Sequence, residues 1–115
     1  RLVVGDLTLD PLRAGLRGLD ERRRAAEDAV ANMETPGYTA RRVDFERSLA
    51  SAIDSGDPAS MHSTTTFTAD PALPNGNNVQ VDQELIGLTD TGLRQQLLVE
   101  AANAKFRLLR TVIGS

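Results

Sequence analysis

The stretch Asn32-Met33-Glu34-Thr35-Pro36-Gly37-Tyr38 marks the point where a helical pattern ends and an irregular sequence begins. Pro36 presets φ for the second position of a tight turn, and Gly37 accepts the positive φ that a type II turn needs at its third position. Thr35 precedes a proline and is therefore biased toward an extended conformation. We expect a helix to end near Met33 and the chain to turn sharply, with Tyr38 on the outer edge of the turn.

The segment before this turn has the pattern of an amphipathic helix. Asp10-Pro11 is a helix-start signal, because aspartate can cap free amide groups and proline fits the first helical position. The next apolar positions alternate in steps of four and three, which predicts the seam of a heptad helix. The seam consists of Leu12, Leu16, Leu19, Arg23, Ala26, Val30 and Met33. Gly15 and Gly18 each weaken the helix by ~1 kcal/mol relative to alanine, so we expect this end to fray.

Arg23 interrupts the apolar seam and allows two interpretations. The neighbouring sequence is rich in carboxylates, so an exposed helix face with ion pairs four residues apart is the simpler one. The alternative is that Arg23 reaches past Gly92 to a carboxylate on a neighbouring chain.

The last segment, residues 79–114, also has a helical pattern and starts between Asn78 and Asp82. Its first stripe alternates in steps of four and three along Val81, Leu85, Leu88, Gly92, Gln95, Val99, Ala102, Phe106, Leu109 and Ile113. A second stripe lies beside it, along Ile86, Leu93, Leu97, Ala101, Ala104, Leu108 and Val112. Together they form a wider apolar face than one shorter helix can cover. We predict that the uncovered part is an interface with another chain.

Between the two helical segments, residues 34–78 predict a turn followed by an irregular loop. Residues 39–53 contain a short amphipathic piece anchored by Phe45, Leu49 and Ile53. Residues 54–78 hold few apolar side chains, and so long a loop is unusual inside a compact domain. We expect it to be partly disordered until bound, or else to be a variable surface segment. Asn75-Gly76 can turn a hairpin, although its flanks do not alternate.

The predicted fold is therefore one mainly α domain spanning residues 1–115. Its long terminal helices, at residues 11–33 and 79–114, pair as a coiled-coil-like hairpin and hold the irregular residues 34–78 between them.

Composition excludes several functional classes. The net charge of −3 argues against a nucleic-acid-binding protein, which normally needs a basic face. The chain has no cysteine for disulfides or thiolate metal sites, and His62 is its one histidine, in a polar stretch. No stretch approaches the ~20 apolar residues of a membrane span, and no signal-peptide layout is present. We find no acid–base, nucleophile, metal or phosphate-binding pattern, and expect no enzyme, no cofactor and no small-molecule substrate.

Three segments carry a resemblance to a known family. Residues 31–38 resemble the A-N-x-x-T-P-G-Y motif of the bacterial flagellar axial proteins, which form the rod, hook and hook-associated subunits. Residues 76–85 resemble the G-N-x-V-x-x-D-x-E-[ML] start of the C-terminal helix in the proximal rod branch of this family, and the last turns resemble the K-F-x-x-L-x-x-x-I tail of that branch. The flanking residues 41–45 and the short chain resemble the proximal rod branch. The motif residues are Asn32, Thr35, Pro36, Gly37, Tyr38, Phe45, Asn78, Glu84 and Phe106.

The resemblance covers about residues 8–53 and 75–114. The chain departs from the family pattern at Ala29, where an asparagine is usual, and at Arg23 in the seam.

The resemblance implies a structural protein of the flagellar basal body. Such subunits leave the cytoplasm through the flagellar type III export apparatus without a cleaved signal. They self-associate into a helical rod that crosses the periplasm, with their terminal helices forming an inner coiled-coil tube. The implied partners are the other rod subunits, the membrane ring, the adaptor FliE and the export gate, and torque passes through these contacts.

Two alternatives remain open from the sequence: a helical-hairpin adaptor that dimerises through its heptads, and a sibling rod subunit. An adaptor should be a stable, highly helical oligomer. A rod subunit should be partly disordered as a monomer and fold its terminal helices on assembly.

Overall fold

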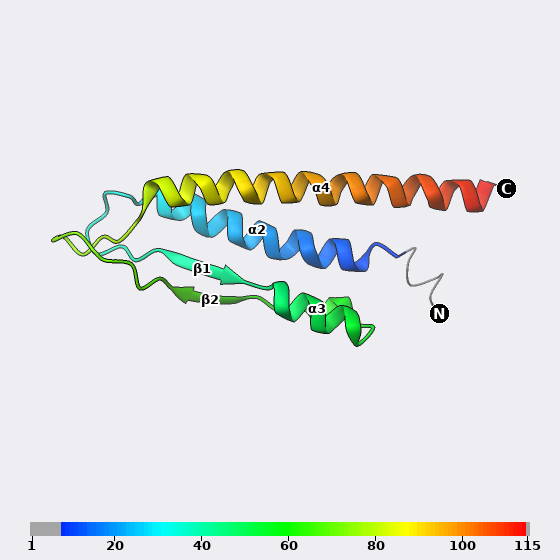
Figure 1. Ribbon diagram of the computed structural model, residues 1–115, viewed down its shortest axis with the longest axis horizontal. Helices are drawn as coiled ribbons and strands as arrows, with labels where there is room; N and C mark the ends of the chain where they lie inside the picture. Colours follow the sequence, from blue (N-terminus) through cyan, green and yellow to red (C-terminus); the bar gives the residue numbers. More distant parts are fainter. Residues whose placement is uncertain (1–7, 115) are drawn as a thin grey trace.

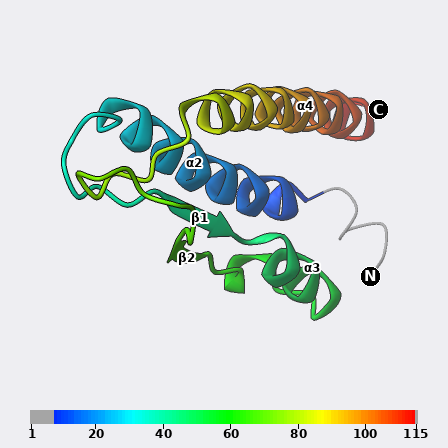
Figure 2. The same ribbon diagram turned by 60° about the vertical axis from the view of Figure 1, so that its left-hand side comes forward.

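The computed structural model describes residues 8–114 of the chain as an elongated molecule of 65 × 25 × 14 Å. Two long helices, α2 (Asp10–Ala31) and α4 (Val81–Gly114), run side by side. On the other side of α2 lie strand β1 (Arg41–Asp44), helix α3 (Glu46–Asp54) and strand β2 (Thr64–Phe67), with a short 3-10 helix, η1 (Pro58–Ser60), between α3 and β2. Helix α2 is thus the middle layer, as Figures 1 and 2 both show. The prediction of a mainly α fold is confirmed.

Helix α2 begins one residue earlier and ends two residues earlier than predicted. Its first residue is Asp10, whose side chain forms no capping bond, so the prediction that Asp10 is the cap is wrong. A carboxylate in the first turn is still favoured by the helix dipole. The helix ends at Ala31 because the chain already forms a turn at Asn32, where the N–H of Thr35 donates to the Asn32 carbonyl oxygen over 3.0 Å.

The buried face of α2 is made mostly of small residues. Among the predicted seam residues, Leu19 and Ala26 are buried, whereas Met33 is 42% exposed and the rest are half-buried. The buried positions are Ala14, Gly15, Gly18, Leu19, Ala25, Ala26 and Ala29. The seam prediction is therefore only partly right. Because α2 is covered from two sides, its buried surface is broader than one stripe, and small side chains allow both neighbours to approach closely.

The side of α4 that faces α2 differs from the predicted first stripe, because it is rotated about the helix axis. Less exposed positions alternate in steps of three and four along Val81, Glu84, Leu88, Thr91, Gln95, Leu98, Ala102, Lys105 and Leu109. Half of the predicted first stripe, including Leu85, Val99 and Phe106, is exposed instead. The two helices do pack together, but this mixed polar and apolar seam does not confirm coiled-coil pairing.

The prediction of an irregular middle is wrong for residues 41–67, which contain two strands and a helix. Strands β1 and β2 pair antiparallel, from Arg41 opposite Phe67 to Asp44 opposite Thr64. Helix α3 corresponds to the predicted amphipathic piece, although its anchor Ile53 is 42% exposed.

Phe45 fixes residues 41–67 to α2. Its ring is 4% exposed and lies in a core cluster with Ala14, Leu19, Ala52 and Met61, flanked by Leu49 and Leu98. A Cβ atom at Gly18 would lie 2.4 Å from the Phe45 ring. Gly18 is therefore a contact surface for this ring, and not merely a weak point of the helix.

Candidate functional site

The turn predicted at Thr35-Pro36-Gly37-Tyr38 is present. The N–H of Tyr38 donates to the carbonyl oxygen of Thr35 over 3.2 Å, and Gly37 has a φ of 77°. Both features are those expected of a type II turn with proline and glycine at its centre. Tyr38 itself is half-buried.

Asn32 holds the turn to the end of α2. Its side-chain nitrogen donates to the carbonyl oxygen of Asp28 over 2.8 Å, and its side-chain oxygen accepts from the hydroxyl of Thr35 over 3.0 Å. Helix end and turn are therefore linked through one amide side chain, which uses both its donor and its acceptor.

Asn77 joins this turn to the segment that leads into α4. Its side-chain nitrogen donates to the carbonyl oxygens of Asn32 and Thr35, each over 2.8 Å, while its oxygen accepts from the N–H of Val79 over 2.9 Å. Asn77 is only 1% exposed. Asn77 occupies the asparagine position of the G-N-x-V motif but is not among the predicted motif residues.

Asn78 joins the same segment to the start of β1. Its side-chain oxygen accepts from the N–H of Ala40 over 2.7 Å, and its side-chain nitrogen donates to the hydroxyl of Thr68 over 3.0 Å. Its own N–H donates to the carbonyl oxygen of Tyr38 over 3.1 Å. Asn78 therefore bridges three segments of the chain.

Two glycines make this close approach possible. The N–H of Gly37 donates to the carbonyl oxygen of Asn75 over 2.9 Å. Gly76 has a φ of 88°, and a Cβ atom there would lie 3.2 Å from the Cα atom of Gly37. We call residues 32–40 together with residues 75–79 the junction. Within the described residues, no buried side-chain nitrogen or oxygen lacks a hydrogen-bond partner.

The motif residues thus fall into two groups. The junction brings together Asn32, Thr35, Pro36, Gly37, Tyr38 and Asn78. The other three lie apart from it. Phe45 is in the core, Glu84 is half-buried in the first turns of α4, and Phe106 is 51% exposed in the last third of that helix. Their roles in assembly stay predictions.

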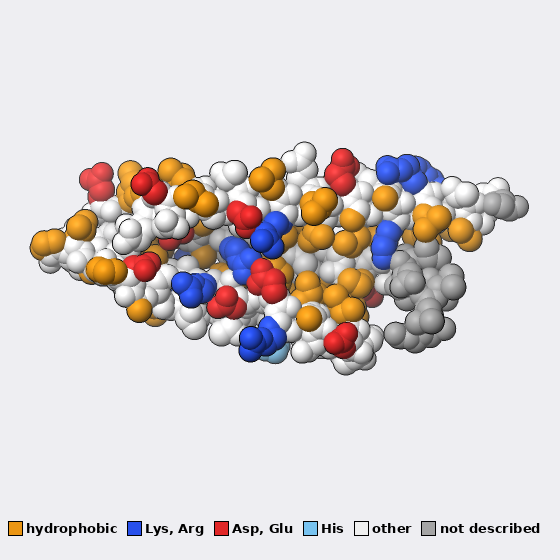
Figure 3. All heavy atoms as spheres, viewed as in Figure 1, with side chains coloured by type: hydrophobic (Ala, Val, Ile, Leu, Met, Phe, Trp, Pro, Cys, Tyr) orange, Lys and Arg blue, Asp and Glu red, His pale blue; other side chains and the backbone are white. Residues whose placement is uncertain are grey.

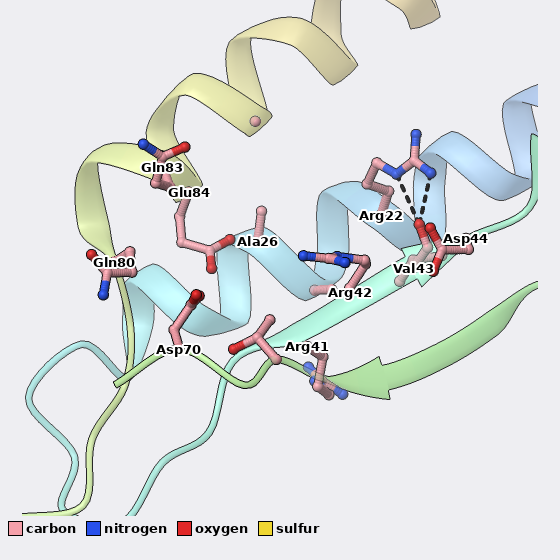
Figure 4. Close-up of a pocket in the computed structure, with 13 residues that line it drawn as sticks. Arg22, Ala26, Arg41, Arg42, Val43, Asp44, Asp70, Gln80, Gln83 and Glu84 are labelled. Carbon is pink, nitrogen blue, oxygen red and sulfur yellow. Dashed lines mark hydrogen bonds between the residues drawn. The ribbon is translucent and has the colours of Figure 1, made fainter. Parts of the chain in front are cut away.

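Next to the junction, an open pocket of about 670 Å³ lies between α2, β1 and the start of α4. Figure 4 shows the carboxylates of Glu84 and Asp70 pointing toward one another across this pocket, with Arg42 on its β1 side. Burial, and secondarily the charge of Asp70, raise the pKa of the Glu84 carboxyl. Most of the residues that line this pocket are charged or polar, and Ala25, Ala26 and Val43 add apolar surface.

Arg22 connects α2 to the start of α3. It donates to the carbonyl oxygen of Val43 over 2.7 and 3.1 Å, and its Nη2 donates to a Glu46 oxygen over 2.8 Å. Its guanidinium also lies 4.8 Å from the centre of the Phe45 ring, a cation–π distance. The bond from Arg22 lowers the pKa of Glu46 to about 2.

Arg23, by contrast, pairs within its own helix, with Asp20 and with Glu27 at 2.8 Å. This supports the interpretation of Arg23 as part of an exposed face with local ion pairs. His62 is exposed, and its N–H donates to the hydroxyl of Ser48 over 3.0 Å.

No group of three or more His, Cys, Asp or Glu side chains within residues 8–114 could hold a metal ion. No helix in the same range is long and apolar enough to cross a membrane.

The outward side of α4 carries a row of exposed apolar side chains. Figure 3 shows apolar side chains at several points along the helix. The row comprises Ile86, Leu93, Leu97, Leu108 and Val112 of the second predicted stripe, with exposures from 51% to 68%. Exposed apolar rows of this extent typically mark contact surfaces.

Comparison with known proteins identifies the family. The chain is 30% identical to the flagellar basal body rod protein FlgB of Bacillus subtilis over an alignment of 119 positions, which covers 92% of each chain. The chain belongs to the FlgB family. It is also 26% identical to FlgB of Escherichia coli, over 93% of this chain and 98% of the relative, and 23% identical to FlgB of Proteus mirabilis, over 82% and 84%. No family model matches the chain.

The predicted resemblance is therefore confirmed, and the chain is a flagellar basal body rod protein. FlgB relatives are named as rod components, so the family is one of structural proteins and not of enzymes. The relatives are matched over most of their length and over most of this chain.

Proposed function

We propose that this chain polymerises in the proximal part of the flagellar rod, where it transmits torque from the membrane ring toward the hook. The observation that carries the proposal is the exposed apolar row on α4 in a chain related to FlgB over nearly its whole length. The chain's own helices leave this apolar row exposed to water. Covering it with a neighbouring subunit stabilises the assembly by roughly 25 cal/mol per Å² of apolar surface buried.

The contact expected for a rod is heterologous, since one surface of a subunit meets a different surface of the next. Such contacts do not close on themselves and therefore build helical filaments. The junction supports this role geometrically. Its hydrogen bonds fix the direction in which residues 38–44 leave the end of α2, so every subunit presents residues 41–67 at the same angle to its neighbours.

The proposed neighbours are other rod subunits, and at the base of the rod FliE, the membrane ring and the export gate. We also propose that the chain reaches the periplasm through the flagellar export apparatus without a cleaved signal. The polar pocket beside Glu84 and the apolar row on α4 offer two chemically different surfaces for these contacts.

Replacing Leu93 by glutamate tests the proposal. Leu93 is 62% exposed, so the variant should fold normally. Asn103→Glu places the same charge on an exposed, polar side of α4 and is the matched control. In a flagellated host lacking its own copy of the protein, the Leu93→Glu chain should be absent from purified basal bodies and should not restore motility, whereas the Asn103→Glu chain should do both.

Crosslinking from a photoreactive residue at position 106 in intact basal bodies identifies the neighbours. Crosslinks to rod, ring or FliE subunits are the expected result. Incorporation of Leu93→Glu at the normal level would contradict assembly through this row. A chain that is a stable, highly helical closed oligomer in solution and yields no basal-body crosslinks would favour the adaptor function instead.

A further inference from the structure

The turn that leads into the junction contains an asparagine followed directly by a glycine, Asn75 and Gly76, and Asn75 is exposed. In such a pair the backbone nitrogen of the glycine can reach the side-chain carbonyl carbon of the asparagine. The glycine has no side chain to block this approach, and its backbone adopts conformations closed to other residues. In the sequence this pair is only a hairpin signal. Neither the fold nor the rod function gives the pair a chemical role.

We propose that Asn75 is a site of spontaneous deamidation, and that closure of the junction protects it. In the reaction, the Gly76 nitrogen loses its proton and bonds to the Cγ atom of Asn75. The Cγ–Nδ2 bond breaks and the nitrogen leaves as ammonia, which carries that proton. Water then opens the resulting succinimide at either carbonyl. One product is aspartate, and the other is isoaspartate, in which the main chain runs through the Cβ atom of residue 75.

The folded junction holds both reacting groups in other bonds. The N–H of Gly76 donates to the carbonyl oxygen of Leu73 over 2.8 Å, so its nitrogen is directed away from the Asn75 side chain. The side-chain oxygen of Asn75 accepts from the N–H of Asn77 over 3.0 Å, which fixes the side chain in place. Reaction requires both bonds to open, so the chain is reactive before this turn folds and protected afterwards.

Isoaspartate would be incompatible with the junction. It adds one atom to the main chain beside Gly76, where a Cβ atom would already lie 3.2 Å from Gly37. It also turns the carbonyl that accepts the Gly37 N–H into a displaced, charged carboxylate. Asn77, two residues later, would then be moved out of line with the carbonyls it binds. Deamidation of unfolded chains would thus yield subunits that cannot close the junction, independently of how the rod assembles.

The test incubates the full-length chain at mildly alkaline pH, with and without denaturing urea, and follows each asparagine by peptide mass spectrometry and an isoaspartate-specific methylation assay. In urea, Asn75 should deamidate faster than Asn103, the internal reference. Without urea the rate at Asn75 should fall at least several-fold. Equal rates at Asn75 in the two conditions would overturn the protection, and a rate in urea no faster than that of Asn103 would overturn the site.

Two variants separate the chemistry from its consequence. Asn75→Ser lacks the amide and should show no modification at this position in either condition. Asn75→Asp keeps the main chain and an oxygen for the Asn77 N–H, so it should unfold at nearly the same urea concentration as the unmodified chain. The purified isoaspartate-containing chain should unfold at a lower concentration. Equal unfolding of the isoaspartate and unmodified chains would contradict the proposed effect on the junction.

Discussion

At the scale of single residues, Asn77 links the two segments of the junction through its side chain. It is buried at 1% exposure and makes three hydrogen bonds, to Asn32, Thr35 and Val79. Asn77→Ala removes all three and leaves the Val79 N–H without its acceptor. We expect a loss of about 1–3 kcal/mol in the free energy of unfolding, measured by urea denaturation.

Asn103→Ala is the control for this prediction, because Asn103 is exposed in α4. A surface change of this kind should stay within about 0.5 kcal/mol. If Asn77→Ala matched the control, the junction would contribute little to folding.

The ion pair between Arg22 and Glu46 predicts a pH dependence. The folded pKa of Glu46 is about 2, against an ordinary value of 4.5, chiefly because Arg22 bonds its carboxylate. A lowered carboxyl pKa contributes stability that is present above the unfolded value and lost as the pH falls through the folded value. Glu46→Gln should therefore be less stable than the wild type at neutral pH, with the difference shrinking between pH 4.5 and pH 2.

Urea unfolding midpoints measured across this range test the prediction. Glu100→Gln removes the same charge from an exposed position of α4 and should show a smaller difference from the wild type. A Glu46→Gln difference that stays constant down to pH 2 would rule out the ion pair as its source.

At the scale of elements, two glycines in long helices have opposite expected roles. At Gly18, a Cβ atom would lie 2.4 Å from the Phe45 ring, whereas at Gly92 it would meet nothing within 4 Å. Gly18→Ala should destabilise the protein by about 1–3 kcal/mol through overpacking. Gly92→Ala should stabilise it by up to ~1 kcal/mol through helix propensity. Thermal unfolding of both variants compares them, and equal shifts would contradict the packing role of Gly18.

The two long helices could be predicted from the sequence because their apolar periodicity extends over many turns. Their buried faces could not, because periodicity does not show that α2 is covered from two sides. This is why small residues such as Ala14 and Ala29 are buried while Met33 is exposed.

The small sheet could not be predicted from the sequence, for a different reason. Strands β1 and β2 have four residues each, with the sequences RRVD and TTTF, and all four residues of β2 are exposed. Neither sequence shows a clear alternation of apolar and polar residues. Their stability comes from pairing between distant segments. The turn at Pro36-Gly37 was predicted correctly, since its chemistry is local. The role of Asn77 could not be predicted, because two of its partners, Asn32 and Thr35, lie more than forty residues away along the chain.

At the scale of the whole molecule, the different lengths of the two helices predict uneven stability. Helix α4 has 34 residues and α2 has 22, and α4 continues past the first turn of α2 in Figure 1. The last residues of α4 include exposed Leu108, Val112 and Ile113. A helix end without tertiary packing is marginal in water, because helices in proteins draw most of their stability from packing.

Amide hydrogen exchange should therefore show a gradient along α4. In dilute solution, residues 106–112 should exchange faster than residues 88–98, where α4 packs against α2. In isolated basal bodies the slow exchange should extend to residues 106–112, because neighbouring subunits would cover the apolar row. Peptide-level exchange measured by mass spectrometry in both states makes the comparison. Uniformly slow exchange along α4 in the free chain would show that the helix needs no neighbour to be stable.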